Sequence, residues 1–137
     1  RKLVDLDRKQ RKINQILFLN IGLITATNSS SASGKSKGNL SHSAKEEIRK
    51  ILAQNSGCLY CKSKGKPNKK FTDEKSIVCI GFVDVYVSQN GRVPQSTIQV
   101  LTKTLTDIEI VELLAFISFT HCQQEFGAMM NLQPSNN

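Results

Sequence analysis

Two cysteines separated by two residues, Cys58 and Cys61, are the residues of this sequence best suited to do chemistry. A cysteine at the start of a helix lies near unpaired backbone N–H groups and the positive end of the helix dipole, which favour the thiolate. The two-residue gap lets the second sulfur reach the first and close a small, reducible ring. This spacing therefore predicts a dithiol–disulfide centre, whereas two cysteines without chemical function are the plain alternative.

Five lysines follow the pair within nine residues: Lys62, Lys64, Lys66, Lys69 and Lys70. Their positive charge is expected to lower the pKa of nearby thiols. Only Tyr60 and Phe71 flank this stretch, so it lacks the interleaved aromatic side chains that stack on bases, and we expect no nucleic-acid binding. A solvated loop is the simplest interpretation, and attraction of an anionic partner is the other.

Zinc is a structural alternative for the same pair, because two thiolates supply half of a tetrahedral site. The other Cys and His residues, Cys79, Cys122, His42 and His121, do not stand at finger-like spacing. We therefore expect no metal and no cofactor. Cys79 and Cys122 lie in apolar stretches and are expected to be buried. The spacing of the four cysteines does not suggest a secreted disulfide framework, which favours a cytoplasmic location.

The elements that must position the pair can be predicted from local patterns. Ser43 and Glu46 form a capping-box pattern that starts a helix with apolar residues at helical spacing. Residues 55–57 (Asn-Ser-Gly) end this helix, with Gly57 able to adopt a left-handed cap. Cys58 then opens a new helical turn, which Gly65 and a following proline interrupt.

Three further helices are expected. Residues 73–87 are rich in β-branched side chains, but their length favours a buried helix over a strand, and Asn90-Gly91 ends it. A short helix is expected over residues 96–103. Thr106 and Glu109 form a second capping box before a long helix, whose broad apolar stripe suggests burial on two sides. That stripe consists of Ile110, Val111, Leu113, Leu114, Phe116, Ile117, Ser118, Phe119 and Cys122. Gly127, Pro134 and the polar tail mark the end of this helix.

The 137 residues divide into four parts: an N-terminal arm, helical or extended (1–26), a Ser/Gly/Lys-rich linker (27–39), one domain (40–132) and a polar tail (133–137). Residues 1–40 hold eight Lys and Arg against two acids, so the positive charge concentrates there. The arm either packs on the domain or is a cleavable signal peptide, since basic residues precede an apolar run. No apolar run approaches the roughly 20 residues that span a bilayer, so we expect no membrane segment.

With Glu46 twelve positions before Cys58-x-x-Cys61, residues 40–132 resemble the AhpD-like branch of the carboxymuconolactone decarboxylase family. Its core is Glu-x11-Cys-x-x-Cys-x3-His, and residues 105–117 and Phe126-Gly127 are similar to its second hallmark helix. The resemblance implies an all-α fold that assembles as trimers or hexamers. It also implies a centre that reduces hydroperoxides or exchanges electrons with a thiol or disulfide partner protein. Cys58 and Cys61 would be the redox pair and Glu46 the proton-relay carboxylate.

The sequence departs from this pattern at the relay histidine, where it has Gly65. Deprotonation of a thiol would then depend on Glu46, the lysines, the helix terminus, or His121 if folding brings it close. General-base help is typically worth ~10²–10⁴ in rate, so peroxidase activity is expected to be weak, whereas disulfide exchange needs mainly thiolate and access. Glu46 as a simple cap and His121 as a core residue are the structural alternatives. A non-catalytic helical oligomerisation module is the alternative for the whole domain.

Overall fold

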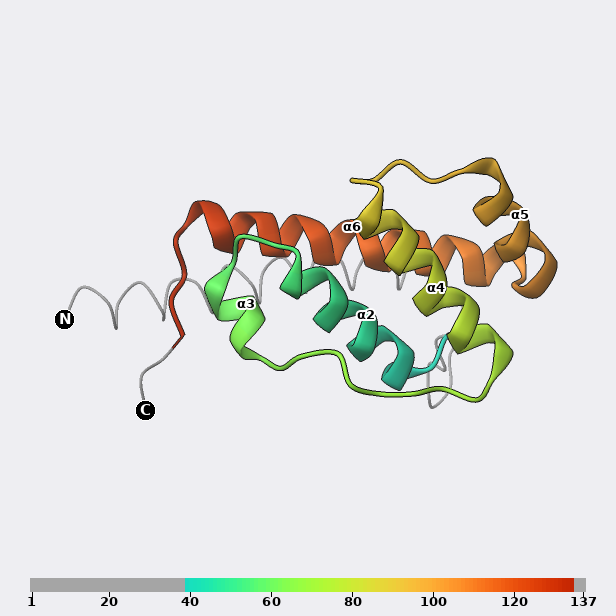
Figure 1. Cartoon of the computed structure of the whole chain (residues 1–137), viewed down its shortest axis with the longest axis horizontal. Helices are drawn as coiled ribbons and strands as arrows, with labels where there is room; N and C mark the ends of the chain where they lie inside the picture. Colours follow the sequence, from blue (N-terminus) through green and yellow to red (C-terminus); the bar gives the residue numbers. More distant parts are fainter. Residues whose placement is uncertain (1–38, 135–137) are drawn as a thin grey trace, which may run out of the picture. The chain divides into compact units, whose positions relative to one another are not determined.

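A computed structural model describes residues 39–134, which fold into five helices and contain no strand (Figure 1). The helices are α2 (His42–Gln54), α3 (Leu59–Ser63), α4 (Glu74–Ser88), α5 (Gln95–Thr104) and α6 (Asp107–Met129). The all-α prediction is confirmed for this part of the chain. The predictions for residues 1–38 and for the last three residues lie outside the described residues. Within the described range, no helix is both long enough and apolar enough to cross a membrane.

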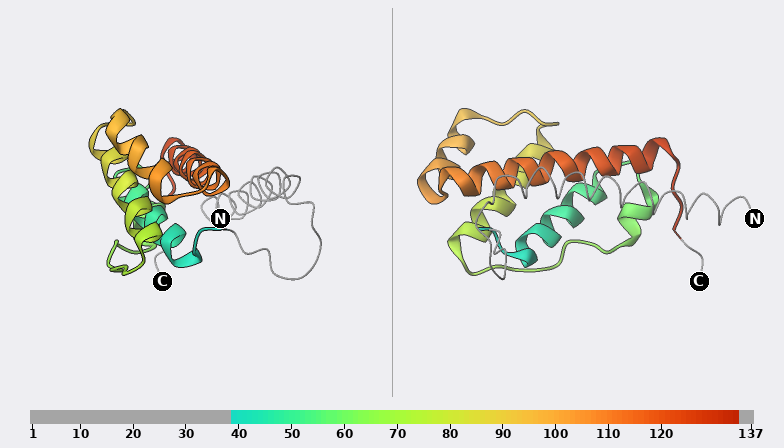
Figure 2. Two further views of the ribbon diagram at one scale, coloured as in Figure 1. Left: turned by 90° about the vertical axis from the view of Figure 1, so that its right-hand side faces the viewer. Right: turned by 180° about the vertical axis from the view of Figure 1, so that it is seen from behind.

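The core lies where α2, α4 and α6 face one another, and α5 packs on α4 (Figure 2). Residues three or four positions apart on α2, α4 and α6 supply most of it, so burial of one face of these helices is the main stabilising term. Its buried members are Leu40, Ile48, Ile51, Leu52, Cys79, Phe82, Val83, Leu101, Leu105, Leu113 and Ile117. The small helix α3 lies outside this cluster. It contacts α2 and the end of α6 that is farther from α5.

Most predicted helix boundaries are confirmed. Asp73 caps α4 by accepting from the N–H of Ser76 at 2.9 Å. Asn90 and Gly91 follow the end of α4 with φ of 51° and 82°, the left-handed region that Asn and Gly tolerate best. The capping box of Thr106 and Glu109 is present at the start of α6. Local side-chain chemistry therefore determines where these helices begin and end.

Three local predictions are wrong. The N-cap of α2 is Ser41, whose Oγ accepts from the N–H of Ala44 at 3.1 Å, because a serine two residues earlier offers the same capping chemistry. Gly57 does not adopt a left-handed conformation, since Asn55 already caps the end of α2. Cys122 is exposed because it lies on the face of α6 that points away from the core.

Candidate redox site

Cys58 and Cys61 form a disulfide at the start of α3, with their Cα atoms 5.2 Å apart. Cys58 is the N-cap of this short helix: its backbone is extended, and its Sγ accepts from the N–H of Cys61 at 3.1 Å. The prediction that Cys58 opens a helical turn is thus confirmed. The backbone N–H lies where it would stabilise negative charge on the sulfur of Cys58 once the disulfide is broken.

The two cysteines of the pair differ in exposure. Cys58 is fully buried, with 0% of its surface exposed, whereas Cys61 is only partly buried. Attack on a disulfide requires access to one of its sulfurs, so Cys61, the less buried of the two residues, is the better candidate for attack.

Gly127 of α6 covers the buried sulfur. A Cβ at this position would lie 2.6 Å from Sγ of Cys58 and 3.5 Å from Sγ of Cys61. The first distance is far inside van der Waals contact, so only glycine lets α6 approach the disulfide this closely. Past the helix, the carbonyl of Leu132 accepts from the N–H of Tyr60 at 3.2 Å. Gly127 lies inside α6, which continues to Met129, so the prediction that Gly127 marks the end of this helix is wrong. Its contact with Cys58 was not predicted from the sequence.

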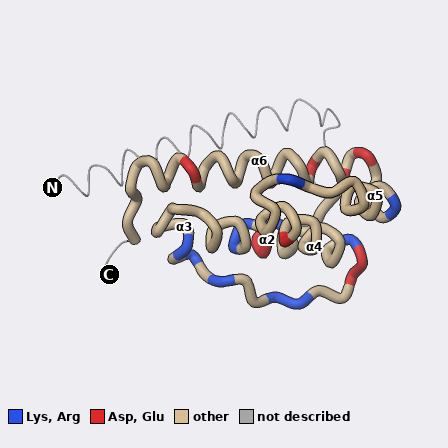
Figure 3. Tube along the Cα trace, turned by 45° about the horizontal axis from the view of Figure 1, so that its top comes forward, with Lys and Arg blue, Asp and Glu red and all other residues tan. Residues whose placement is uncertain are grey.

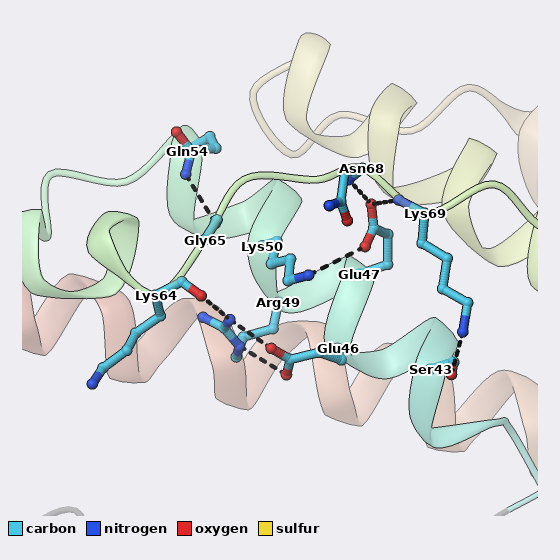
Figure 4. A network of polar contacts seen from close by, with 10 residues as sticks. All are labelled: Ser43, Glu46, Glu47, Arg49, Lys50, Gln54, Lys64, Gly65, Asn68 and Lys69. Carbon is cyan, nitrogen blue, oxygen red and sulfur yellow. Dashed lines mark hydrogen bonds and ion pairs between the residues drawn. The ribbon is translucent and has the colours of Figure 1, made fainter.

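The segment after α3 is fastened along α2 (Figure 4). Glu47, 4% exposed, accepts from the backbone N–H groups of Asn68 at 2.5 Å and Lys69 at 2.9 Å. Gln54 at the other end of α2 donates to the carbonyl of Gly65 at 3.3 Å. Glu47 is not among the predicted site residues, although it stands three residues after Ala44, on the apolar face of α2. An acid in that position indicates a buried partner.

Four of the five lysines near the pair are exposed to solvent. Lys64, Lys66, Lys69 and Lys70 are exposed, and Figure 3 shows the basic segment running from α3 toward α4. Lys64 lies over the ring of Tyr60, 4.4 Å from its centroid, and Lys69 over Phe71 at 5.4 Å. Within residues 39–134, none of these four lysines is ion-paired with a carboxylate. Their positive charge is therefore not neutralised by the described part of the domain.

Glu46 is engaged by a neighbour on its own helix. Its carboxylate accepts from Arg49 at 3.0 Å (Nε) and 2.7 Å (Nη2), and this hydrogen bond holds the pKa of Glu46 below its usual value. Arg49 also donates to the carbonyl of Lys64 at 3.5 Å, which links Glu46 to the segment after α3. A lowered pKa makes Glu46 a weaker base, and its hydrogen bonds go to Arg49 instead of a sulfur. Its relay role stays a prediction.

His121 is exposed on α6, where its Nε2 lies 3.8 Å from Glu125. Its ring meets the ring of Tyr86 of α4 edge-on, with centroids 6.2 Å apart. Neither contact involves Cys58 or Cys61, so the structure does not bring His121 to the sulfurs. At the position predicted for a relay histidine, Gly65 has φ of 121°, a conformation that would strain a histidine. The backbone conformation at this position therefore favours glycine over histidine.

Cys79 and Cys122, the other two cysteines, are free thiols of opposite character. Burial raises the pKa of Cys79 to about 11, so this thiol stays protonated and unreactive at neutral pH. Cys122 is exposed and available to reagents. In the described part of the chain, no three His, Cys, Asp or Glu side chains come together in a way that could hold a metal ion.

Comparisons of the chain with protein-family models, with curated proteins and with solved structures find no match. The proposed chemistry of the site therefore rests on its sequence pattern and its geometry. That geometry is a disulfide between a fully buried and a partly buried cysteine, beside a fastened segment whose lysines have no carboxylate partner among the described residues.

Proposed function

We propose that this protein is a thiol–disulfide oxidoreductase that acts through Cys58 and Cys61. The observation that supports it most is the asymmetry of the disulfide, in which Cys61 is partly accessible and Cys58 is buried with a backbone N–H on its sulfur. A purely structural disulfide needs neither feature. The resemblance of residues 40–132 to the AhpD-like sequence pattern implies the same chemistry. We propose that the protein acts in a reducing cytoplasm, where the pair would cycle.

In the proposed reaction, a partner thiolate attacks Sγ of Cys61 and the bond between the two cysteines breaks. The partner becomes joined to Cys61 in a mixed disulfide, and Cys58 leaves as a thiolate that the N–H of Cys61 stabilises. A second thiolate then attacks the partner's sulfur. This step releases an oxidised partner disulfide and leaves Cys61 as a thiolate, so the protein gains two electrons and the partner loses two. The reverse sequence oxidises the dithiol.

Reduction of hydroperoxides is the other activity that the resemblance implies, and we propose that it is slow here. It needs proton transfer to the leaving oxygen, for which a positioned acid or base contributes ~10²–10⁴ in rate. In the described residues, the hydrogen bond to a sulfur comes from the backbone, while Glu46 binds Arg49 and His121 contacts Tyr86. Disulfide exchange does not require such a group.

The redox equilibrium of the pair tests the proposal. The full chain is equilibrated with ratios of reduced to oxidised glutathione, quenched with acid, alkylated and weighed by mass spectrometry. We expect a reversible Cys58–Cys61 disulfide with a potential in the range of oxidoreductases, roughly −180 to −270 mV. Cys58→Ser and Cys61→Ser should abolish the transition, and Cys122→Ser, which removes an exposed cysteine outside the pair, should not change it.

A pair that never bridges, or that bridges only after a metal is stripped, would contradict the proposal. Elemental analysis of the same samples then distinguishes the two alternatives. Stoichiometric zinc would indicate a zinc-bound pair, and its absence would favour a helical module without redox chemistry. A peroxide-consumption assay with the parent and the two serine variants measures the second activity separately.

A further inference from the structure

The lysine-rich segment beside the disulfide is held in place, which is unusual for a run of exposed charges. Glu47 accepts from two successive backbone N–H groups, and Gln54 donates to the carbonyl of Gly65. Nζ of Lys69 also donates to Ser43 at 2.7 Å (Figure 4). A loop that served only to keep lysines solvated would not need a buried carboxylate to fix its backbone.

The spacing of these anchors along α2 indicates the length of the segment. Gln54 and Ser43 are eleven residues apart on α2, which corresponds to roughly 16 Å along the helix. The segment therefore runs from the accessible Cys61, at the end of α2, back toward its beginning. This length exceeds a single small thiol and matches several residues of an extended peptide, at ~3.3 Å per residue.

The charge of the segment selects the sign of the partner. Residues 58–72 contain five lysines and no acid. The nearby basic residues of α2 are neutralised instead: Lys45 pairs with Glu112, Arg49 with Glu46 at 2.7 Å and Lys50 with Glu47 at 3.8 Å. Among the described residues, positive charge without an acidic partner is thus concentrated in the segment that follows Cys61.

We propose that this segment is a docking surface for an acidic polypeptide that carries the cysteine exchanging with Cys61. The inference rests on the proposed function and specifies its substrate class. Attraction between the lysines and acidic side chains raises the rate of encounter and aligns the partner's sulfur with Cys61. The exchange itself follows the steps given above, with the partner's thiolate as the reductant.

The test uses two peptides of ten residues as reductants of the oxidised full-length protein. Each contains one cysteine, flanked on one side by glutamates in the first peptide and by glutamines in the second. The variant Lys66→Gln/Lys70→Gln removes two exposed lysines that make no hydrogen bond or ion pair with another described residue. Acid quenching, alkylation and mass spectrometry give the initial rate of disulfide reduction.

Arg92→Gln/Lys103→Gln is the matched control, because it removes the same charge from exposed positions next to α4 and at the end of α5. Helix α5 lies at the opposite end of the bundle from α3 (Figures 1 and 2). Glutamates raise the thiol pKa of their own peptide, so rates are compared between proteins for one peptide at a time.

We expect the lysine variant to react about 3–10-fold more slowly than the parent with the glutamate peptide at low salt. The control should react like the parent, and the glutamine peptide should not distinguish the three proteins. The difference should disappear near 1 M salt, where the screening length falls to about 3 Å. If the glutamate peptide reduces parent and lysine variant equally fast, the docking surface is wrong while the proposed function stands. If neither peptide reduces the disulfide, the proposed function itself fails.

Discussion

At the scale of single residues, the absence of a side chain at Gly127 matters as much as the sulfurs it covers. Glycine in the middle of a helix costs about 0.5–1 kcal/mol relative to alanine. At this position the cost is offset by contact between α6 and Cys58, which a Cβ 2.6 Å from Sγ would prevent. The buried state of one sulfur, and with it the asymmetry of the disulfide, depends on this residue.

Gly127→Ala is therefore expected to destabilise the domain by about 1–3 kcal/mol, the usual cost of overpacking. The matched control is Gly81→Ala in α4, where a new Cβ would meet no atom within 4 Å. It should stabilise by about 0.5–1 kcal/mol through helix propensity alone. Urea unfolding of both variants measures the difference. Equal stabilisation by the two substitutions would show that α6 does not press on Cys58.

Glu47 and Glu46 are adjacent acids that are expected to contribute to stability by different amounts. Glu47→Ala leaves two backbone N–H groups without their buried acceptor and should lower the free energy of unfolding by about 1–3 kcal/mol. Glu46→Ala removes a largely exposed ion pair with Arg49 and should cost less than about 1 kcal/mol. Hydrogen exchange should also accelerate at the amides of Asn68 and Lys69 in Glu47→Ala only. Unchanged exchange there would mean that Glu47 does not hold the lysine segment.

At the scale of elements, the start of α6 links two helices through one carboxylate. Glu109 is 4% exposed, accepts from the N–H of Thr106 at 2.8 Å and pairs with Lys75 of α4. The hydrogen bond from Lys75, together with that from Thr106, holds the pKa of Glu109 below its usual value of 4.5. The ionised form is therefore stabilised by folding.

This shift predicts the effect of pH on stability. A carboxyl whose pKa is lower in the folded state contributes stability that is present above its unfolded pKa and is lost as pH falls through the folded pKa. The difference in free energy of unfolding between the parent and Glu109→Gln should thus be constant above about pH 5 and shrink below pH 4.5. Urea unfolding at a series of pH values measures it. A difference that persists unchanged to low pH would show that the charge of Glu109 is not what stabilises this junction.

The distance in sequence between two interacting residues explains which features could be predicted from the sequence. Helix starts at Asp73 and Thr106 and the turn at Asn90-Gly91 depend on neighbours in the chain, so local patterns suffice. The Cys58–Cys61 pairing is local for the same reason. Gly127 and Cys58, by contrast, are 69 residues apart in the sequence. Glu47 is more than twenty residues from the backbone groups of the lysine segment that it binds. These contacts depend on how helices dock, which periodicity does not specify.

At the scale of the whole molecule, α6 presents apolar side chains to solvent as well as to the core. Ile108 and Val111 are 70% and 64% exposed, and Leu114 is 40% exposed. One side of α6 is buried in the core, as predicted. Within the described residues the other side is exposed, so its burial stays a prediction. Assembly into trimers or hexamers stays a prediction, and light scattering of the full chain in solution measures it directly.

The disulfide links positions only three apart in sequence, which limits what it contributes to the stability of the whole domain. In the chain-entropy account, closing so small a loop stabilises by about 2 kcal/mol. The core cluster of α2, α4, α5 and α6 does not include either sulfur of the pair. Reduction should therefore lower the free energy of unfolding by about 2 kcal/mol and leave the helices formed, as a reversible exchange centre requires.

Guanidinium unfolding of the full chain with and without reductant, followed by circular dichroism, measures this difference. The double variant Cys58→Ser/Cys61→Ser should match the reduced protein and be insensitive to reductant. Cys122→Ser should match the parent in both conditions, because it lies on the exposed face of α6. Loss of the helical signal on reduction alone would show that the bond holds the fold together. In that case the pair would be structural, since a centre that unfolds each time it is reduced cannot pass electrons repeatedly.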